Sequence, residues 1–338
     1  LLLPALAFCL TAAAQDFDNE PTIELKKNDF RFTVGARMMA DVAYYHSDFT
    51  PLKSGGALSD ARIRTSFAYK DWYFYADFGF GGGKFSQKNI FAQWSRTNLK
   101  GATNYVKAGY YNDPGSMARN TSLASYHFIS RPGCTMALGV GRELGISYKI
   151  QNKSFFLNQG ISTDHAYNEQ AAGFDGIAVS GRWLYRPVND ARNTFHIGVN
   201  ARFAHNGNGK VVNNVLQRTI TLGQAMETYV DGTQDLVSAE LPWANNVINV
   251  GAEVLYKNPK FFARGEFLWK HVTKSRDSYS LFEDAQDNID CWGTYEAWLA
   301  ANPLRNNNFY GGYLELGYKI FGDPYTYNDS EAVLGGFS

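Results

Sequence analysis

The stretch FRFTVGARMMADVAY at residues 30–44 decides the fold class of this chain. Its apolar and small side chains are Phe30, Phe32, Val34, Ala36, Met38, Ala40, Val42 and Tyr44. They occupy every second position, and polar side chains such as Arg31, Arg37 and Asp41 fall between them. Alternation with a period of two predicts a long β-strand with one apolar face.

The same pattern returns in DARIRTSFAYKDWYFYADFGF at residues 60–80, interrupted only at Lys70 and Asp71. Two alternating runs joined by two residues predict a β-hairpin with a tight turn. Nine further alternating runs lie at residues 90–94, 106–110, 144–148, 155–161, 177–185, 195–203, 250–256, 261–269 and 310–320. The sequence therefore predicts twelve antiparallel strands and an all-β fold.

The connections between these strands alternate in length. Short links are expected at residues 70–71, 97–103, 150–153, 187–192 and 257–260, and long loops at residues 46–57, 81–87, 112–135, 163–173, 206–245 and 273–307. All short turns thus fall at one end of the strands, which is typical of outer-membrane barrels with short periplasmic turns. Strands of about ten residues also suit a tilted membrane-spanning strand. We therefore expect a transmembrane antiparallel β-barrel.

The two faces of the strands differ in charge. If the apolar face points to lipid, the opposite face carries twelve basic and seven acidic side chains. A Lys or Arg on the lipid face near mid-membrane would cost about 2–4 kcal/mol, so this placement favours a polar lumen. The alternative is a soluble barrel or sandwich with its apolar face inward. In that case Phe32, Phe67, Phe74 and Val199 would pack in an enclosed centre.

Composition excludes several other classes. Lys and Arg number 32 and Asp and Glu number 32, so net charge gives no reason to expect a nucleic-acid partner. No uninterrupted run of about 18 apolar residues occurs, which excludes a helical membrane protein. With 24 Phe, 21 Tyr and 7 Trp, the chain is also too aromatic to stay unfolded.

The N-terminal segment LLLPALAFCLTAAA, residues 1–14, is uncharged and ends in small residues. This is typical of the apolar region and cleavage site of a secretory signal peptide. We expect a signal peptide remnant at residues 1–14, lacking its basic start, followed by one barrel domain at residues 15–338. In an oxidising compartment Cys134 and Cys291 could pair, but the sequence does not show whether they meet.

Several motifs resemble one known family. Asp60–Arg64 and Lys70–Tyr75 are similar to the second and third strands of the bacterial phosphate-selective porins O and P, and Val106–Ser116 is similar to the segment that leads into their third loop. Thr121–Ser122, Arg131–Pro132, Gly141–Gly145 and Tyr318–Asp323 follow in the family's order. The resemblance implies a 16-stranded, usually trimeric outer-membrane barrel. It also implies that the third long loop, residues 112–135, folds into the lumen and narrows it.

The chain departs from that family in two respects. It stops at Gly335–Ser338 with twelve predicted strands, so we expect a chain cut off before its last strands, because an open sheet edge is not viable in hydrocarbon. Its third loop offers few basic residues, chiefly Arg119 and Arg131, where phosphate-selective members carry many. Only a mild anion preference is therefore expected.

The candidate site residues follow from this reading. We expect Arg37, Arg62, Arg64 and Arg182 in the pore wall and Arg119, Ser122 and Arg131 at the constriction. Guanidinium groups suit phosphate or carboxylate because their planar donors fit two oxygens at once. The alternative remains open that these arginines pair across strands with Asp41, Asp60, Asp77 and Glu143 and merely keep the lumen hydrated.

No motif indicates an enzyme, a metal site or a cofactor. The six His residues have no partner at metal-ligand spacing, and Gly79–Phe85 lacks the residues and the helix of a phosphate-binding loop. The sequence favours a bacterial outer-membrane porin, a passive channel for small polar solutes with a mild preference for anions such as phosphate. The alternative is a non-channel barrel with a plugged lumen, a structural or surface-binding protein whose loops at 206–245 and 273–307 contact a partner.

Overall fold

The computed structural model describes residues 22–335, except 47, 49–50, 82–83, 127, 165–175, 208, 213–214, 226–227, 229, 234, 276–293, 295, 298–299 and 301–303. Within these residues, thirteen strands form one antiparallel sheet with neighbours in chain order. They are β1 (Thr22–Lys27), β2 (Phe30–Ala43), β3 (Gly55–Tyr69), β4 (Trp72–Gly79), β5 (Ser86–Thr97), β6 (Thr103–Asn112), β7 (Arg142–Gln151), β8 (Phe155–Ser162), β9 (Ile177–Asn189), β10 (Thr194–His205), β14 (Ala244–Lys257), β15 (Phe261–Lys274) and β16 (Asn307–Tyr318). The expected signal peptide and Cys291 lie outside the described residues.

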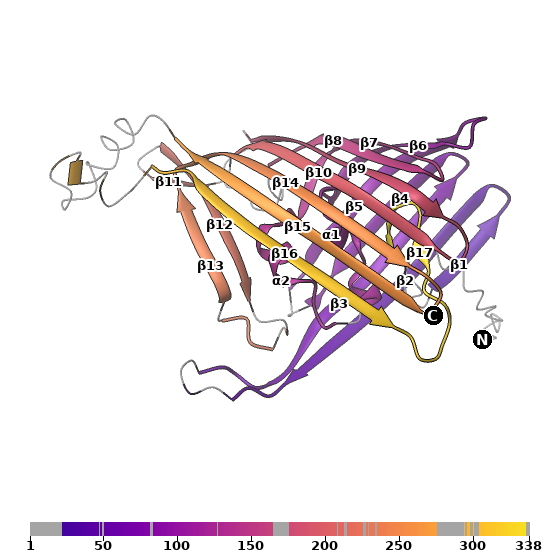
Figure 1. The fold of residues 1–338 in the computed structure, drawn as a ribbon, viewed down its shortest axis with the longest axis horizontal. Helices are drawn as coiled ribbons and strands as arrows, with labels where there is room; N and C mark the ends of the chain where they lie inside the picture. The colour runs from indigo at the N-terminus through magenta and orange to yellow at the C-terminus, as the bar shows by residue number, and fades with distance from the viewer. Residues whose placement is uncertain are drawn as a thin grey trace, which may run out of the picture.

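The all-β prediction is confirmed, and the twelve predicted strands correspond to β2–β10 and β14–β16. The sequence reading missed β1, which pairs with β2 from Thr22 opposite Gly35 to Lys27 opposite Phe30. In the described part of the chain β1 and β16 are the two edges of the sheet. Figure 1 shows the long strands side by side, curving around the short helices between them.

The short turns close at one end of the sheet, as predicted, and a side-chain oxygen organises several of them. Asn152 Oδ1 accepts hydrogen bonds from the backbone N–H groups of Ser154 and Phe155, both at 2.8 Å. Asn258 does the same for Lys260 at 2.9 Å and Phe261 at 2.7 Å. Asn and Asp favour turns because they bond their own backbone in this way.

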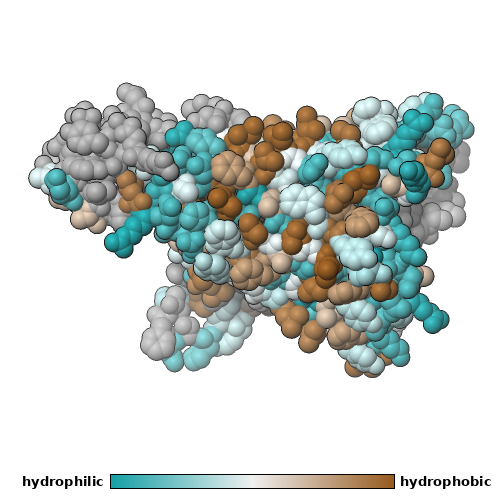
Figure 2. Space-filling model, turned by 45° about the horizontal axis from the view of Figure 1, so that its top comes forward, coloured by the Kyte–Doolittle hydropathy of each residue, from teal (hydrophilic) through white to brown (hydrophobic). Residues whose placement is uncertain are grey.

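The outer surface of the sheet is apolar and its inner surface is charged. Ile63 is 47% exposed, whereas Arg64 beside it is 5% exposed. Phe74 and Val199 are also exposed, so the alternative with these side chains in an enclosed centre is excluded. Figure 2 shows apolar side chains gathered across the middle of the surface, with hydrophilic ones at both ends. No helix among the described residues is long and apolar enough to span a membrane.

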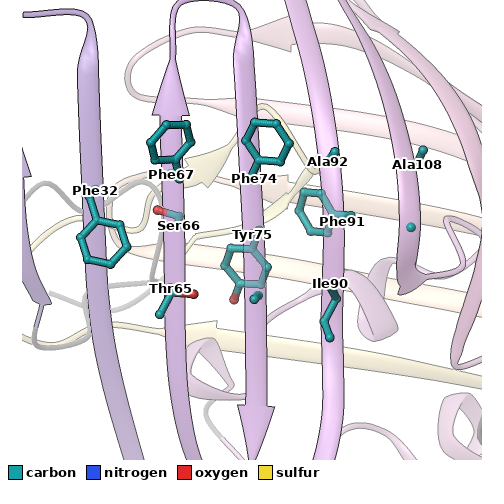
Figure 3. Close-up of a pocket in the computed structure, with 12 residues that line it drawn as sticks. Phe32, Thr65, Ser66, Phe67, Phe74, Tyr75, Ile90, Phe91, Ala92 and Ala108 are labelled. Atoms are coloured by element: carbon teal, nitrogen blue, oxygen red, sulfur yellow. The ribbon is translucent and has the colours of Figure 1, made fainter.

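The outer face is hollowed over β3–β6. A hollow of about 450 Å³ is lined mainly by aromatic and small apolar side chains, among them Phe67, Phe74 and Ala92 (Figure 3). It forms because Phe74 pairs across the strands with Ala92, and Ala92 pairs in turn with Ala108. Two small side chains in one row leave the space that larger ones fill elsewhere.

Two further segments fold against the inner face. The connection between β6 and β7 contains α1 (Met117–Asn120), η2 (Leu123–Ser125) and α2 (Gly133–Leu138), and we call residues 113–141 the constriction loop. The last described residues form a hairpin of β17 (Tyr327–Asn328) and β18 (Val333–Leu334), and we call residues 325–335 the C-terminal hairpin. A third sheet, β11 (Gly209–Val212), β12 (Val215–Ala225) and β13 (Asp235–Pro242), occupies the long connection before β14, where the sequence predicts only a loop.

Candidate pore and constriction

The constriction loop is fastened to the inner wall at β15. The backbone N–H of Met117 donates to Glu266 Oε1, and that of Ala118 lies 3.2 Å from Oε2. The hydroxyl of Ser116 donates to the same carboxylate at 3.1 Å. Met117 and Ala118 are fully buried. The loop therefore lies inside the curve of the sheet, as the family resemblance implies.

Both arginines expected at the constriction bond within the loop itself. Arg119 donates to the carbonyl oxygens of Thr135 at 2.9 Å and Met136 at 2.7 Å. Arg131 donates to those of Ala118 at 2.9 Å and Thr121 at 2.7 Å. These bonds tie the first half of the loop to the second and give it a defined shape.

Tyr126 links the loop to a wall arginine. Its hydroxyl donates to the carbonyl of Ala118 at 3.1 Å, and its ring centroid lies 4.4 Å from the guanidinium carbon of Arg264 on β15. Burial raises the pKa of Tyr126 to about 12, so this hydroxyl stays protonated and keeps its donor. A cation over an aromatic face is attracted by the ring quadrupole.

Ser122, the third residue expected at the constriction, joins the loop to β2. Its hydroxyl accepts a hydrogen bond from Arg37 Nη1 at 3.3 Å. The loop thus contacts the wall at β15 through Glu266 and at β2 through Arg37. The sequence placed Arg37 and Ser122 in the same pore, and the structure brings them together.

The predicted wall arginines of β2 and β3 lie among carboxylates. Arg37 pairs with Asp60. Arg62 pairs with both Asp60 at 2.7 Å and Asp77 at 3.0 Å. Arg64 Nε lies 3.9 Å from Asp77. The pairing with Asp60 and Asp77 that the sequence left open is therefore present, and the role of these arginines in selecting solutes stays a prediction.

Arg182 of β9 is the most enclosed of the predicted wall residues, at 1% exposure. Its guanidinium binds Glu253 of β14 through two hydrogen bonds of 2.7 and 2.9 Å. It also donates to the carbonyl oxygens of Glu331 and Ala332, both at 2.8 Å. Arg182 therefore connects two strands that are not neighbours and holds the C-terminal hairpin against them.

The C-terminal hairpin has further charged attachments. Lys149 of β7 donates to the carbonyl of Ser330 at 2.6 Å and pairs with Glu331 at 3.0 Å. Arg186 of β9 pairs with Asp329 at 2.8 Å. Burial opposes ionisation of Glu331, but the ammonium groups of Lys149 and Lys107 outweigh it and lower its pKa to about 2. Glu331 is therefore a carboxylate at neutral pH.

Several other cations of the lumen region have no ion-pair partner among the described carboxylates, and four of them, none named as a site residue from sequence, are candidate residues of the passage. They are Lys88, Lys107, Arg142 and Lys270. Lys88 lies within electrostatic range of Arg142 and Arg62 and, more weakly, of Asp60 and Asp77, and Arg142 donates to Asn89 Oδ1 at 2.7 Å. Lys107 lies 4.6 Å from the ring centroid of Phe91. Lys88 and Arg142 flank long loops. This position is the sequence feature that could have marked them as candidate site residues.

The described residues hold no group of three or more His, Cys, Asp or Glu side chains that could bind a metal ion. The charged groups of the inner face are mainly guanidinium, ammonium and carboxylate groups, and the backbone of the constriction loop lies among them. This arrangement can bind and release charged solutes reversibly, without a covalent step.

The family model for phosphate-selective porin O and P matches residues 32–335 of this chain. The chain belongs to the phosphate-selective porin O and P family. A comparison with curated proteins found no match. Membership of this porin family, together with the thirteen-stranded antiparallel sheet in the described residues, identifies the protein as an outer-membrane porin of the β-barrel class.

Proposed function

We propose that this porin is a passive diffusion channel for small polar solutes with a mild preference for anions such as phosphate. The balance of charge on the inner face supports the anion preference. Carboxylates such as Asp60, Asp77 and Glu253 pair with arginines, whereas Lys88, Lys107, Arg142 and Lys270 have no carboxylate within 4.0 Å among the described residues. Glu266 is a described carboxylate that also lacks a cation within 4.0 Å, so the uncompensated charge on the inner face is mainly, and not wholly, positive.

An excess of one sign in a narrow passage with low-dielectric walls raises the local concentration of counter-ions. Conduction also requires sites that solutes enter readily and leave readily. Guanidinium groups already bonded to carboxylates offer an anion fewer free donors than unpaired ones do. Paired arginines therefore favour weak binding and mild selectivity over tight phosphate binding.

The test is the reversal potential of the purified porin in a planar bilayer under a potassium chloride gradient. We expect a reversal potential displaced toward the chloride equilibrium potential. Added phosphate should lower the chloride conductance as it competes for the same passage. A reversal potential displaced toward potassium would contradict the anion preference and leave the diffusion channel in place.

We also propose that the porin acts as a homotrimer and carries out no catalysis. The trimer rests on the family, and the apolar hollow over β3–β6 gives the outer face a shape that another subunit could cover. The molar mass of the porin in detergent, measured by light scattering with the detergent subtracted, tests it. A monomeric mass at micromolar concentration would contradict the trimer.

A second candidate function is a structural or surface-binding barrel with a plugged lumen. One observation favours it, because Met117 of the constriction loop packs in one apolar cluster with Val333 and Leu334 of the C-terminal hairpin. Two inward-folded segments that touch reduce the open cross-section. Absence of conductance by a correctly folded protein would favour this candidate over the channel.

A further inference from the structure

Glu266 of β15 lies directly opposite Glu253 of β14 in the sheet. Both are nearly fully buried. Like charges directly opposite each other destabilise a sheet, so each carboxylate needs its own compensation. Glu253 has Arg182 at 2.7 Å and His196 at 3.3 Å.

Among the residues that the structure describes, no cation lies within 4.0 Å of the Glu266 carboxylate, and its hydrogen-bond partners come from the constriction loop. It accepts hydrogen bonds from the backbone N–H groups of Met117 and Ala118 and from the hydroxyl of Ser116. A buried carboxylate without partners is strongly unfavourable, and hydrogen bonds to a charged group are stronger than those between neutral groups. The free energy of this carboxylate therefore depends on the position of the loop.

Hydrogen bonds within the constriction loop couple its first turn to the rest of the loop. Arg119 and Arg131 bond to carbonyl groups at Thr135, Met136, Ala118 and Thr121. At Gly139, in the second half, an added Cβ would lie 3.2 Å from Nε and 3.3 Å from Cγ of Arg119 in the first half, which shows how closely the two halves approach. Because these internal contacts make the constriction loop rigid, an attachment at one point fixes the position of the whole loop.

Two other polar contacts between the loop and the wall are longer, and in one of them Arg202 Nε of β10 lies 3.8 Å from Asp113 Oδ2. Arg37 donates to Ser122 at 3.3 Å, and the same guanidinium is bound to Asp60. The Glu266 carboxylate accepts hydrogen bonds from three donors of the loop, whereas the Ser122 hydroxyl accepts one hydrogen bond from Arg37. The attachment at β15 is therefore the strongest of these three polar attachments.

We propose that Glu266 is the positioning residue that fixes the constriction loop against β15 and thereby sets the width of the passage. The inference rests on the proposed channel function for its effect on solutes. Its structural content, that Glu266 immobilises the loop, can be tested whether or not the protein conducts.

The test uses two variants of Glu266 that remove increasing parts of its hydrogen bonding to the loop. Glu266→Gln keeps the volume and one acceptor oxygen but removes the charge and places an amide N–H₂ where the second oxygen accepts. Glu266→Ala removes all three bonds. The matched control is Glu253→Gln, which removes the charge of a lumen carboxylate directly across the sheet. The ion-pair partners of Glu253, Arg182 and His196, lie outside the loop.

The first readout is the accessibility of Cys134, which lies on α2 of the loop and is half-buried. In the full-length porin with Cys9 and Cys291 replaced by Ser, a maleimide should label Cys134 about tenfold faster in Glu266→Gln, the ratio expected for loss of one hydrogen bond to a charged group. Glu266→Ala should react faster still, and Glu253→Gln should change the rate much less than Glu266→Gln does, because Glu253 reaches the loop only through Arg182 and the C-terminal hairpin. Heat-modifiable migration in gels identifies the folded fraction, and a failure of the Ala variant to fold leaves the Gln variant to decide.

The second readout is conduction. We expect Glu266→Gln channels to show more open-channel noise and to pass larger sugars in a liposome-swelling assay, whereas Glu253→Gln changes ion selectivity without changing the size limit. Unchanged Cys134 labelling in folded Glu266→Gln and Glu266→Ala would overturn the inference. If the parent porin does not conduct, the proposed function fails, and the labelling result alone decides the role of Glu266.

Discussion

Arg37 of β2 and Arg62 of β3 lie directly opposite each other in the sheet, and the carboxylate of Asp60 binds both. Two guanidinium groups at one cross-strand position repel each other unless an anion lies between them. Asp60 supplies that anion from the strand that carries Arg62. The pair is therefore a site where one carboxylate controls both the stability of the wall and its charge.

Replacing Asp60 with Asn should lower the free energy of unfolding by about 2 kcal/mol, because it breaks a largely buried ion-pair network while leaving the cations in place. The reversal potential should move further toward chloride, because one negative charge is lost from the inner face. Urea unfolding and bilayer recordings measure the two effects. Asp48→Asn is the control, since Asp48 is exposed and pairs only loosely with His46 at 3.8 Å. If the Asp60 variant left the reversal potential unchanged, the cluster of Arg37, Asp60 and Arg62 would lie outside the conduction path.

Replacing Lys88 or Arg142 with Gln should reduce the anion preference. These side chains lie within electrostatic range of each other and form no ion pair within 4.0 Å with a described carboxylate, so we expect their charge to act on solutes. We expect the chloride-to-potassium permeability ratio to fall about twofold for each variant, as for one partly screened charge in a hydrated passage. Lys100→Gln in the turn between β5 and β6 is the matched control, because Lys100 is exposed at the end of the sheet. Equal ratios for all three variants would contradict the assignment.

The strands could be predicted because the alternation of side chains between the two faces of a strand is visible in a short stretch of sequence. Each alternating run fixes which residues share a face, and Asn and Asp at positions such as 152 and 258 mark the turns between runs. β1 was missed because TIELKK offers only two apolar positions, Ile23 and Leu25, and gains its strand character by pairing with β2. The sheet of β11–β13 was missed because it lies within one long connection between two predicted strands.

The face of each wall arginine could be predicted, but its partner could not. Arg182 and Glu253 are 71 residues apart and lie on β9 and β14, with β10 between them. Their meeting depends on the register of two successive strand pairs and on the C-terminal hairpin. For the same reason nothing in the sequence near Glu266 indicates that backbone amides of a loop about 150 residues earlier would bind it.

Replacing Gly109 with Ala should destabilise the porin by about 1–3 kcal/mol, the usual cost of forcing a side chain into a rare backbone conformation. Gly109 has a φ of +137°, and an added Cβ would lie 2.4 Å from the carbonyl oxygen of Ile90 on the neighbouring strand. Gly141→Ala is the control, because an added Cβ there meets nothing within 4 Å. Comparing the urea midpoints of the two variants checks the prediction. Equal midpoints would show that β5 and β6 can separate at this position without cost.

Acidification should release the C-terminal hairpin. Its Glu331 has a pKa lowered from 4.5 to about 2, with burial opposed by the charges of Lys149 and Lys107. A carboxylate whose pKa is depressed by folding contributes stability above its unfolded pKa and loses it as the pH falls through the folded value. The hairpin should therefore be fully held above about pH 4.5 and weaken progressively toward about pH 2.

Hydrogen exchange at Gly335, whose N–H donates to the carbonyl of Thr326 at 3.0 Å, reports on that release. Protection factors, which correct for the intrinsic effect of pH on exchange, should fall across this window in the parent porin. In Lys149→Gln the fall should begin at a higher pH, because the nearest cation holding Glu331 ionised is gone. Arg192→Gln, a change in an exposed turn residue, should leave the curve in place. Constant protection of Gly335 down to pH 2 in the parent would mean that the apolar packing of Val333 and Leu334, rather than the ion pair, holds the hairpin.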